Sequence, residues 1–182
     1  MPTIYISSDS HFDHANVLKF IDEKTGIRIR PEFDTIEEMN EEIIKRHNSV
    51  VSVNDTFYHL GDVGFNKNKL NNILPRLNGK KRLVLGNHDG STKDWFEMYF
   101  KYFEKIMESR RMGDVLFTHR PAFLGETEER IKASVFGHLH EKNIDDPRYL
   151  NLSVEQTNYT PISLDEIKEI YKNRGIEIDY KL

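Results

Sequence analysis

The chain has 182 residues, of which 31% are charged, and it carries a net charge of −4 and no cysteine. This length suits one well-filled domain over residues 1–182, and no linker or low-complexity tract divides it. The missing cysteines exclude disulfides, thiolate zinc sites and a cysteine nucleophile. The mildly acidic balance argues against stable nucleic-acid binding through a broad basic face. Bound cations can nevertheless attract an anionic substrate.

The first residues and the longest apolar runs indicate where the protein works. Residues 1–4 place no basic segment before an apolar core, so we find no secretion signal. No apolar run approaches the ~18 residues needed to span a bilayer. We therefore expect a cytoplasmic protein without membrane contact, either a monomer or a small homo-oligomer.

The N-terminal part begins with an apolar run that predicts a strand over residues 3–8. A loop rich in Asp and His follows, and then a short helix over 15–21 with Val17, Leu18 and Ile21 facing inward. Residues 22–31 are polar and carry two arginines, which predicts an exposed excursion.

A clear amphipathic helix is predicted over residues 34–50, with Asp34 as its cap and Glu37 three residues later. A second strand over 56–61 and a helix over 66–77 come next. An amphipathic helix beside buried strands needs a sheet on which to pack. This region therefore favours an α/β arrangement.

The run Arg82–Leu85 predicts a central strand that stops at Gly86, where the chain turns and a side chain would obstruct it. After it, Ser91 is the expected cap of an aromatic helix over 95–103. We interpret the aromatic stripe of that helix as a packing face rather than a base-stacking platform.

The last part of the chain is rich in strands and closes with a helix. The order of elements predicts a layered α/β fold with a mixed sheet. The expected elements are a strand pair over 106–112 and 114–118 turned at Gly113, a short helix around 126–132, strands over 133–137 and 145–152, and a helix capped by Ser163 with Glu166.

Five apolar runs end on a residue that can bind a metal ion. Ligands collect at the carboxyl ends of strands in open α/β sheets, so we expect these residues to share one site. Seven oxygen or nitrogen donors without sulfur suit two cations that share a carboxylate. The donors are Asp9, His11, Asp62, Asn87, His119, His138 and His140.

The spacing of the donors suggests how they chelate. In Asp9–His11 and His138–His140 the two residues are two positions apart, which directs both side chains to one side of an extended chain. Asp62 stands alone at the end of a central strand, and we predict that its carboxylate bridges the two cations.

Such a pair of cations can hold a phosphate, lower the pKa of a bound water and stabilise a departing oxygen. His88 is not needed as a ligand and is free to protonate a leaving group near neutral pH. The residues therefore favour hydrolysis of a phosphoester.

The ordered motifs resemble those of the calcineurin-like metallophosphoesterases, in particular a compact branch found in bacteria and phages. The family motifs D-x-H, G-D, G-N-H-[DE], a lone H and G-H-x-H correspond here to Asp9-Ser10-His11, Gly61-Asp62, Gly86-Asn87-His88-Asp89, His119 and Gly137-His138-Leu139-His140.

The resemblance implies a four-layer α/β/β/α sandwich of mixed sheets flanked by helices. It also implies two divalent cations, with manganese foremost and iron, nickel, zinc or cobalt as alternatives. By the same resemblance the first cation is held by Asp9, His11, Asp62 and His140, and the second by Asp62, Asn87, His119 and His138.

One position departs from the family pattern. Many members have G-D-x-x-D, whose second aspartate supports the acid histidine, whereas Phe65 stands at that place here. Support for His88 must then come from elsewhere. Asp89 and the Asp13–His14 pair are both candidates, and the sequence does not choose between them.

Several further side chains are candidates for contacts outside the metal ligands. Guanidinium groups match phosphate oxygens two at a time, so Arg30 and Arg120 are predicted substrate contacts, together with His14. Arg28 and Arg30 can equally be exposed loop charges. We expect His59 to be a buried hydrogen-bonding residue and His47 to pack.

The predicted substrate is a small phosphorylated molecule, either a phosphodiester or a phosphomonoester. Two alternatives remain open at this point. One is a nuclease, which ranks lower because of the acidic charge balance. The other is a metal-binding scaffold for a protein partner that has lost turnover.

Overall fold

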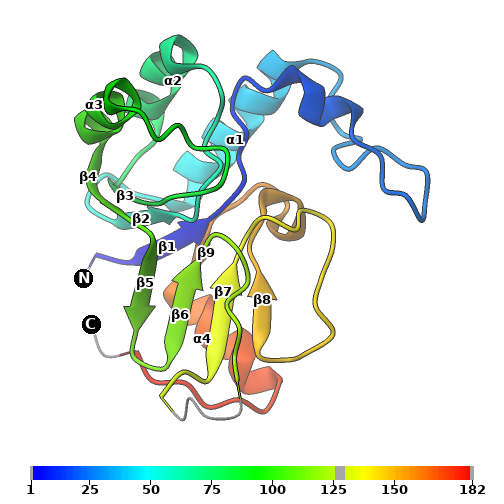
Figure 1. The fold of residues 1–182 in the computed structure, drawn as a ribbon, viewed down its shortest axis with the longest axis vertical. Coiled ribbons are helices and arrows are strands. Elements are labelled where there is room, and N and C mark those ends of the chain that lie inside the picture. The colour runs from blue at the N-terminus through cyan, green and yellow to red at the C-terminus, as the bar shows by residue number, and fades with distance from the viewer. Residues whose placement is uncertain (1, 126–129, 181–182) are drawn as a thin grey trace.

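Two mixed β-sheets form the centre of the computed structural model, which describes residues 2–125 and 130–180 (Figure 1). The first sheet has the order β4-β3-β2-β1-β9, in which only β9 is antiparallel to its neighbour. Its strands are β1 (Ile4–Ser7), β2 (Thr56–His59), β3 (Lys80–Val84), β4 (Phe103–Met107) and β9 (Ile162–Ser163).

The second sheet has the order β5-β6-β7-β8, with β5 antiparallel to β6 and the other pairs parallel. Its strands are β5 (Ser109–Met112), β6 (Val115–Thr118), β7 (Ala133–Phe136) and β8 (Tyr149–Asn151). Side chains from both sheets share one buried cluster, to which Ile6, Tyr58, Phe117 and Val135 contribute. The two sheets are therefore held together by apolar packing.

Helices flank this pair of sheets, as predicted. The helices α1 (Ile36–Val50), α2 (Lys67–Ile73) and α3 (Lys93–Tyr102) lie on the side of the first sheet in Figure 1 and bury a second apolar cluster against it. Helix α4 (Leu164–Asn173) instead joins the cluster shared by the two sheets. The predicted α/β fold with mixed sheets is confirmed.

Short 3-10 helices are η1 (Ala15–Lys19), η2 (Leu74–Arg76) and η3 (Val154–Thr157). Among the described residues, no helix is long and apolar enough to cross a membrane.

The start of α1 differs by one residue from the prediction. Thr35, not Asp34, is the N-cap: its hydroxyl accepts from the Glu38 N–H, and the Glu38 carboxylate accepts from the Thr35 N–H, both at 3.2 Å. Asp34 instead forms an ion pair with Arg28. The capping box therefore uses Glu38 rather than Glu37.

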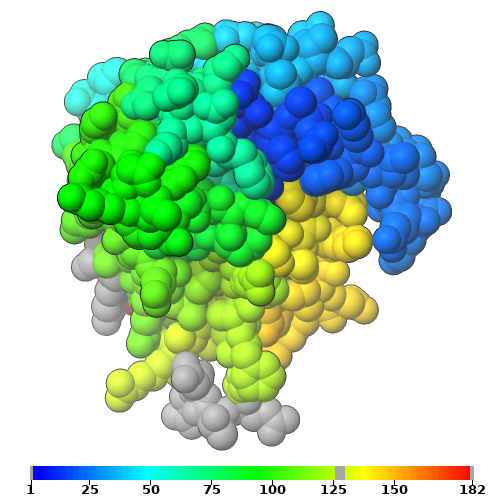
Figure 2. Space-filling model, turned by 45° about the horizontal axis from the view of Figure 1, so that its top comes forward, coloured from blue at the N-terminus to red at the C-terminus, as the bar shows by residue number. Residues whose placement is uncertain are grey.

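The N-terminal excursion is an arm that projects beyond the rest of the molecule (blue in Figures 1 and 2). Ile21 pairs with Arg28 across the arm, and the Asp22 N–H donates to the Ile27 carbonyl at 2.8 Å. The helix preceding the arm ends at Lys19. For this reason Ile21 is 57% exposed, and the prediction that it faces inward is wrong.

The predicted strand over 106–112 is two strands in different sheets. β4 ends at Met107 and pairs with β3, whereas β5 begins at Ser109 and pairs with β6 across the predicted turn at Gly113. The chain therefore crosses from one sheet to the other at Glu108.

Two other helix predictions meet different outcomes. The N-cap of α3 is Thr92 rather than Ser91, whereas the capping box of Ser163 and Glu166 on α4 is confirmed. In the short helix expected around 126–132, residues 126–129 lie outside the described part, and residues 130–132 are not helical.

Candidate metal centre

The seven predicted ligands follow five strands, and the structure brings them together. Because β1, β2 and β3 are parallel, their following loops leave the first sheet at one edge, and the loops after β6 and β7 meet them from the second sheet. Blue, green and yellow segments join on one face in Figure 2. The ligands are Asp9 and His11 after β1, Asp62 after β2, Asn87 after β3, His119 after β6, and His138 and His140 after β7.

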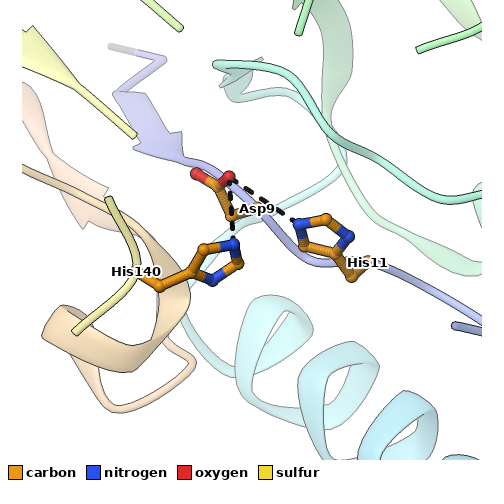
Figure 3. Close-up of side chains that lie close together, drawn as sticks. All are labelled: Asp9, His11 and His140. Atoms are coloured by element: carbon orange, nitrogen blue, oxygen red, sulfur yellow. Dashed lines mark ion pairs between the residues drawn. The ribbon is translucent and has the colours of Figure 1, made fainter. Parts of the chain in front are cut away.

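The first cluster consists of Asp9, His11 and His140 (Figure 3). The Asp9 Oδ1 atom lies 3.8 Å from His11 Nε2 and 4.0 Å from His140 Nε2. Asp9 Oδ1 and His11 Nε2 are buried and have no hydrogen-bond partner in residues 2–125 and 130–180. Buried polar atoms without partners are costly, and around a cation with bonds of about 2.1 Å such ligand atoms lie roughly 3.4 Å apart. The cluster therefore fits a divalent cation.

Burial sets the protonation of this cluster. It raises the pKa of Asp9, against the opposing charges of His119 and His140. Burial, together with the charge of Arg30, also lowers the pKa of His11 far below its usual range. His11 is thus a neutral imidazole at neutral pH, which is the form that binds a cation.

The second cluster consists of Asp62, His119 and His138. His119 donates a hydrogen bond from Nδ1 to the Leu60 carbonyl at 2.8 Å. The Nε2 atom is then the one that can bind a cation. Asn87 joins the cluster because its Oδ1 lies 2.9 Å from this Nε2.

Asp62 stands between the two clusters. Its Oδ2 atom lies 3.8 Å from His11 Nε2 in the first cluster and 3.5 Å from His119 Nε2 in the second. Its other oxygen accepts the His88 backbone N–H at 2.9 Å, which fixes the orientation of the carboxylate. This placement is the one that a bridging carboxylate needs.

The backbone at the ligand pairs is not extended, so the prediction that an extended chain directs both side chains to one side is wrong. Asp9, His11, His138 and His140 have φ angles of 57°, 49°, 67° and 49°, so neither D-x-H nor H-x-H is an extended chain. Asp62 is also in this left-handed region, at 56°. Non-glycine residues adopt it at an energetic cost, which is typical of functional sites. The ligands converge through tight turns and not through strand alternation.

The motif glycines are required by close contact. A Cβ on Gly86 would overlap the Asp62 carboxylate, and one on Gly137 would overlap Ser8 and the Asp9 carboxylate. The φ angle of Gly86 is not positive, so the turn itself does not require a glycine there. What requires it is the close approach of Asp62, where a side chain would obstruct the chain. Larger residues at these positions would displace the bridging or chelating oxygens.

Arg30 is placed very differently from the prediction that it contacts substrate. Its side chain is 0% exposed, and its guanidinium donates to the carbonyls of Asp9 at 2.6 Å and Ser10 at 2.9 Å. It also pairs with Glu155 at 2.7 Å. Arg30 therefore holds the ligand loop from within the protein and is not an exposed loop charge.

Glu155 is a functional residue that the sequence analysis missed. Its Oε1 accepts from Arg30 Nε and from His140 Nδ1, both at 2.8 Å, so the imidazole presents Nε2 to Asp9. Burial opposes ionisation, but Arg30 and His140 lower the pKa of Glu155 to about 2. For His140, burial acts to lower the pKa. The negative charges of Glu155 and Asp9 outweigh burial, so the pKa of His140 is raised overall. The carboxylate of Glu155 is thus permanently charged beside a metal ligand.

The segment from Asn151 to Glu155, which begins at the last residue of β8, supports the same cluster at other points. The Ser153 hydroxyl donates to Asp9 Oδ2 at 3.1 Å, and Asn151 donates to the His140 carbonyl at 3.0 Å. The sequence contained a signal for this segment, because the apolar run at 149–152 also ends in polar residues. It lacks the His or Asp that would have marked it as a ligand.

Asp89 is not a partner of His88. Its carboxylate accepts from the backbone N–H groups of Asp62, Val63 and Gly86, at 2.8 to 3.0 Å, and from the Tyr99 hydroxyl. It therefore ties the loop after β2 to the loop after β3. The His88 ring is exposed and contacts Phe65, with centroids 5.2 Å apart, and within the described residues no hydrogen bond reaches the imidazole.

The remaining predicted side chains surround the centre. His14 is half-buried and lies 5.5 Å from the His11 ring. Arg120 is exposed, and its charge adds to burial and to His119 in lowering the pKa of His138. His59 is buried and contacts the Ser10 hydroxyl at 2.8 Å, and His47 is buried on α1, as expected for both.

Comparison with known proteins identifies relatives along nearly the whole chain. The family model described as calcineurin-like phosphoesterase matches residues 2–178. The protein MJ1445 of Methanocaldococcus jannaschii is 33% identical over 183 residues, covering 93% of this chain and 92% of that protein. The Gene 66 protein of Mycobacterium phage L5 is 28% identical, covering 79% of this chain and 80% of that protein.

A solved structure agrees with these matches. The protein AQ665 of Aquifex aeolicus has a TM-score of 0.70 and 27% identity, with 93% of this chain and 100% of that chain covered. The resemblance noted in the motifs is therefore confirmed: this chain belongs to the calcineurin-like phosphoesterase family.

Proposed function

We propose that this chain is a metal-dependent phosphoesterase that hydrolyses a phosphodiester or a small phosphomonoester. The observation that carries the proposal is the position of Asp62 Oδ2, within 3.8 Å of a ligand atom in each of the two clusters. A carboxylate shared in this way is what a two-cation hydrolytic centre requires. Family membership and the complete set of seven ligands support the same conclusion.

Two divalent cations, with manganese foremost, would be held here. The first cluster would hold one, the second cluster together with Asn87 would hold the other, and Asp62 would be shared by both. When bound, they would hold the phosphate oxygens, acidify a water and stabilise the departing oxygen. The protein supplies the rest. His88 is exposed at the rim, where its imidazole can give a proton to the leaving oxygen. Arg120, beside His138, can contact a phosphate oxygen.

Replacing the shared carboxylate tests the proposal. Asp62→Asn keeps the size of the side chain but removes the charge between the clusters. We expect hydrolysis of bis(p-nitrophenyl) phosphate and p-nitrophenyl phosphate with manganese to fall to background, as it should in the wild type after chelation. Asp165→Asn, on the exposed first turn of α4, is the control and should retain full activity. Hydrolysis by a fully chelated wild type would refute the proposal.

The scaffold alternative has one observation in its favour, which is the missing acidic partner of His88. The intact ligand set weighs against it. It would be supported by a protein that binds two manganese ions yet turns over nothing in a panel of phosphodiesters, cyclic nucleotides, phosphomonoesters and single-stranded nucleic acids. The last of these substrates also tests the nuclease alternative.

A further inference from the structure

Phe65 occupies an unusual place for a large apolar side chain. It is 38% exposed and lies among the rings of the candidate ligand His11 and of its neighbours His14 and His88. Its ring stacks on the His11 ring, with centroids 5.5 Å apart and an interplanar angle of 18°. The centroid of the Phe65 ring also lies 4.2 Å from that of His14 and 5.2 Å from that of His88. Phe65 therefore contacts a metal ligand and the proposed acid at the same time.

The aromatic surface continues outward from Phe65. The His14 ring meets Phe20 edge-on at 5.9 Å, and Phe20 is itself 42% exposed. We call Phe65, His14 and Phe20 the aromatic shelf. It extends from the first cluster to the base of the projecting arm, whose position is visible in Figure 2.

The position of the aromatic shelf beside His88 indicates which part of a substrate would contact it. The substrate considered is the phosphoester of the proposed function, on which this inference rests. A phosphate held between the clusters puts the leaving oxygen within reach of His88, because proton transfer needs hydrogen-bond distance. The carbon skeleton attached to that oxygen must then pass beside the neighbour of His88, which is Phe65. The leaving group is thus the part of the substrate that meets the shelf.

We propose that the aromatic shelf is a binding subsite for a planar unsaturated ring in the leaving alcohol, such as an aryl group or a nucleobase. Flat rings gain offset-stacked or edge-on contacts with Phe and His that a saturated ring of the same size cannot reproduce. A sugar or polyol would instead leave its hydroxyl groups unpaired against Phe65 and Phe20.

Two ligand pairs matched in size test the preference for a planar ring, and the pair that is not hydrolysed removes the difference in acidity between the two leaving alcohols. The first compares phosphodiesters that release benzyl alcohol or cyclohexylmethanol. The second compares the binding of benzylphosphonate and cyclohexylmethylphosphonate, which are not hydrolysed, to the manganese-loaded protein by calorimetry. We expect the aromatic member to be preferred about three- to tenfold in both kcat/KM and affinity, in keeping with one aromatic contact.

Variants of Phe65 connect the preference to the shelf. Phe65→Leu should abolish the preference while manganese binding stays unchanged, and Phe65→Tyr should retain it. Phe100→Leu, at a 63% exposed position on α3, is the matched control and should behave as the wild type.

The outcomes separate this inference from the proposed function. Hydrolysis of both esters without a preference for the ring would overturn the subsite and leave the phosphoesterase intact. A preference for benzylphosphonate without hydrolysis of any ester would support the subsite and count against the phosphoesterase. A preference that survives Phe65→Leu, or no binding of either phosphonate, would also overturn the subsite.

Discussion

Glu155 illustrates how a single buried residue can govern a metal ligand. It is the acceptor for His140 Nδ1 and the counter-charge of Arg30, which in turn donates to the backbone carbonyls of Asp9 and Ser10. In the described part of the chain, the contacts of Glu155 go to Arg30 and His140 and to no member of the second cluster. Its influence should therefore fall on one of the two cation positions.

We predict that Glu155→Gln weakens one manganese site about 10- to 100-fold and leaves the other nearly unchanged, because supports of metal-bound histidines have effects of this size. Calorimetric titration of the metal-free protein would resolve the two affinities. Glu32→Gln is a suitable control, since Glu32 accepts a hydrogen bond from Tyr159 but contacts no ligand. A loss of the same size at both sites in Glu155→Gln, or no loss at either, would contradict this role.

At the level of residues, the sequence indicated the candidate ligands but not their supports. The candidates could be recognised because Asp, His and Asn stand at strand ends, which local order along the chain reveals. Arg30 and Glu155 are 125 positions apart, and nothing local shows that they meet. The polar surroundings of Arg30 indicated an exposed loop, whereas its partner comes from the far end of the chain.

The first turn of α1 shows how finely a helix start is specified. Asp34 and Thr35 are both good caps, and each has a glutamate three residues later, so the sequence allowed two registers. Tertiary contact decided between them, because Arg28 from the arm pairs with Asp34 and also donates to the Phe33 carbonyl.

We predict that Thr35→Ala lowers the free energy of unfolding by about 1 kcal/mol, through loss of the capping hydrogen bond. Asp34→Ala should cost much less, because it loses only an ion pair whose carboxylate is largely exposed. Urea unfolding of both variants would measure the difference. A larger loss in Asp34→Ala would mean that the helix begins one residue earlier in solution.

Most elements could be predicted from periodicity, but the sheet to which a strand belongs could not. The run from Ile106 to Met112 contains no glycine or proline that would divide it, yet the chain changes sheets at Glu108. Hydrophobic periodicity reports which face of a strand is buried and not which neighbours it pairs with. Sheet membership is set by packing over the whole chain.

The stability of the whole molecule should depend on pH through His47. This imidazole packs edge-on against Phe57 and contacts the Asn78 carbonyl at 3.0 Å, and burial lowers its pKa to about 4. The folded state thus binds this proton less readily than the unfolded state, whose pKa is near 6.5. The contribution of His47 is complete above pH 6.5 and is lost as the pH falls toward 4.

A pKa lowered by this amount corresponds to roughly 3 kcal/mol. We predict that His47→Gln, which keeps a donor for Asn78 but does not titrate, loses about that much less stability between pH 7 and pH 4 than the wild type. Urea unfolding of both proteins in a chelator gives the comparison. Parallel pH profiles would show that His47 does not contribute.

The two groups of ligand loops belong to different sheets, and this division couples the fold to its surroundings. Occupied sites would add bonds between the halves of the molecule that the unfolded chain cannot make, so cation binding is drawn into the folding equilibrium. A cell that is short of the required cation would then hold less of this protein, as well as a less active form of it. Metal supply would in this way set the lifetime of the polypeptide, with proteases removing the copies that remain empty.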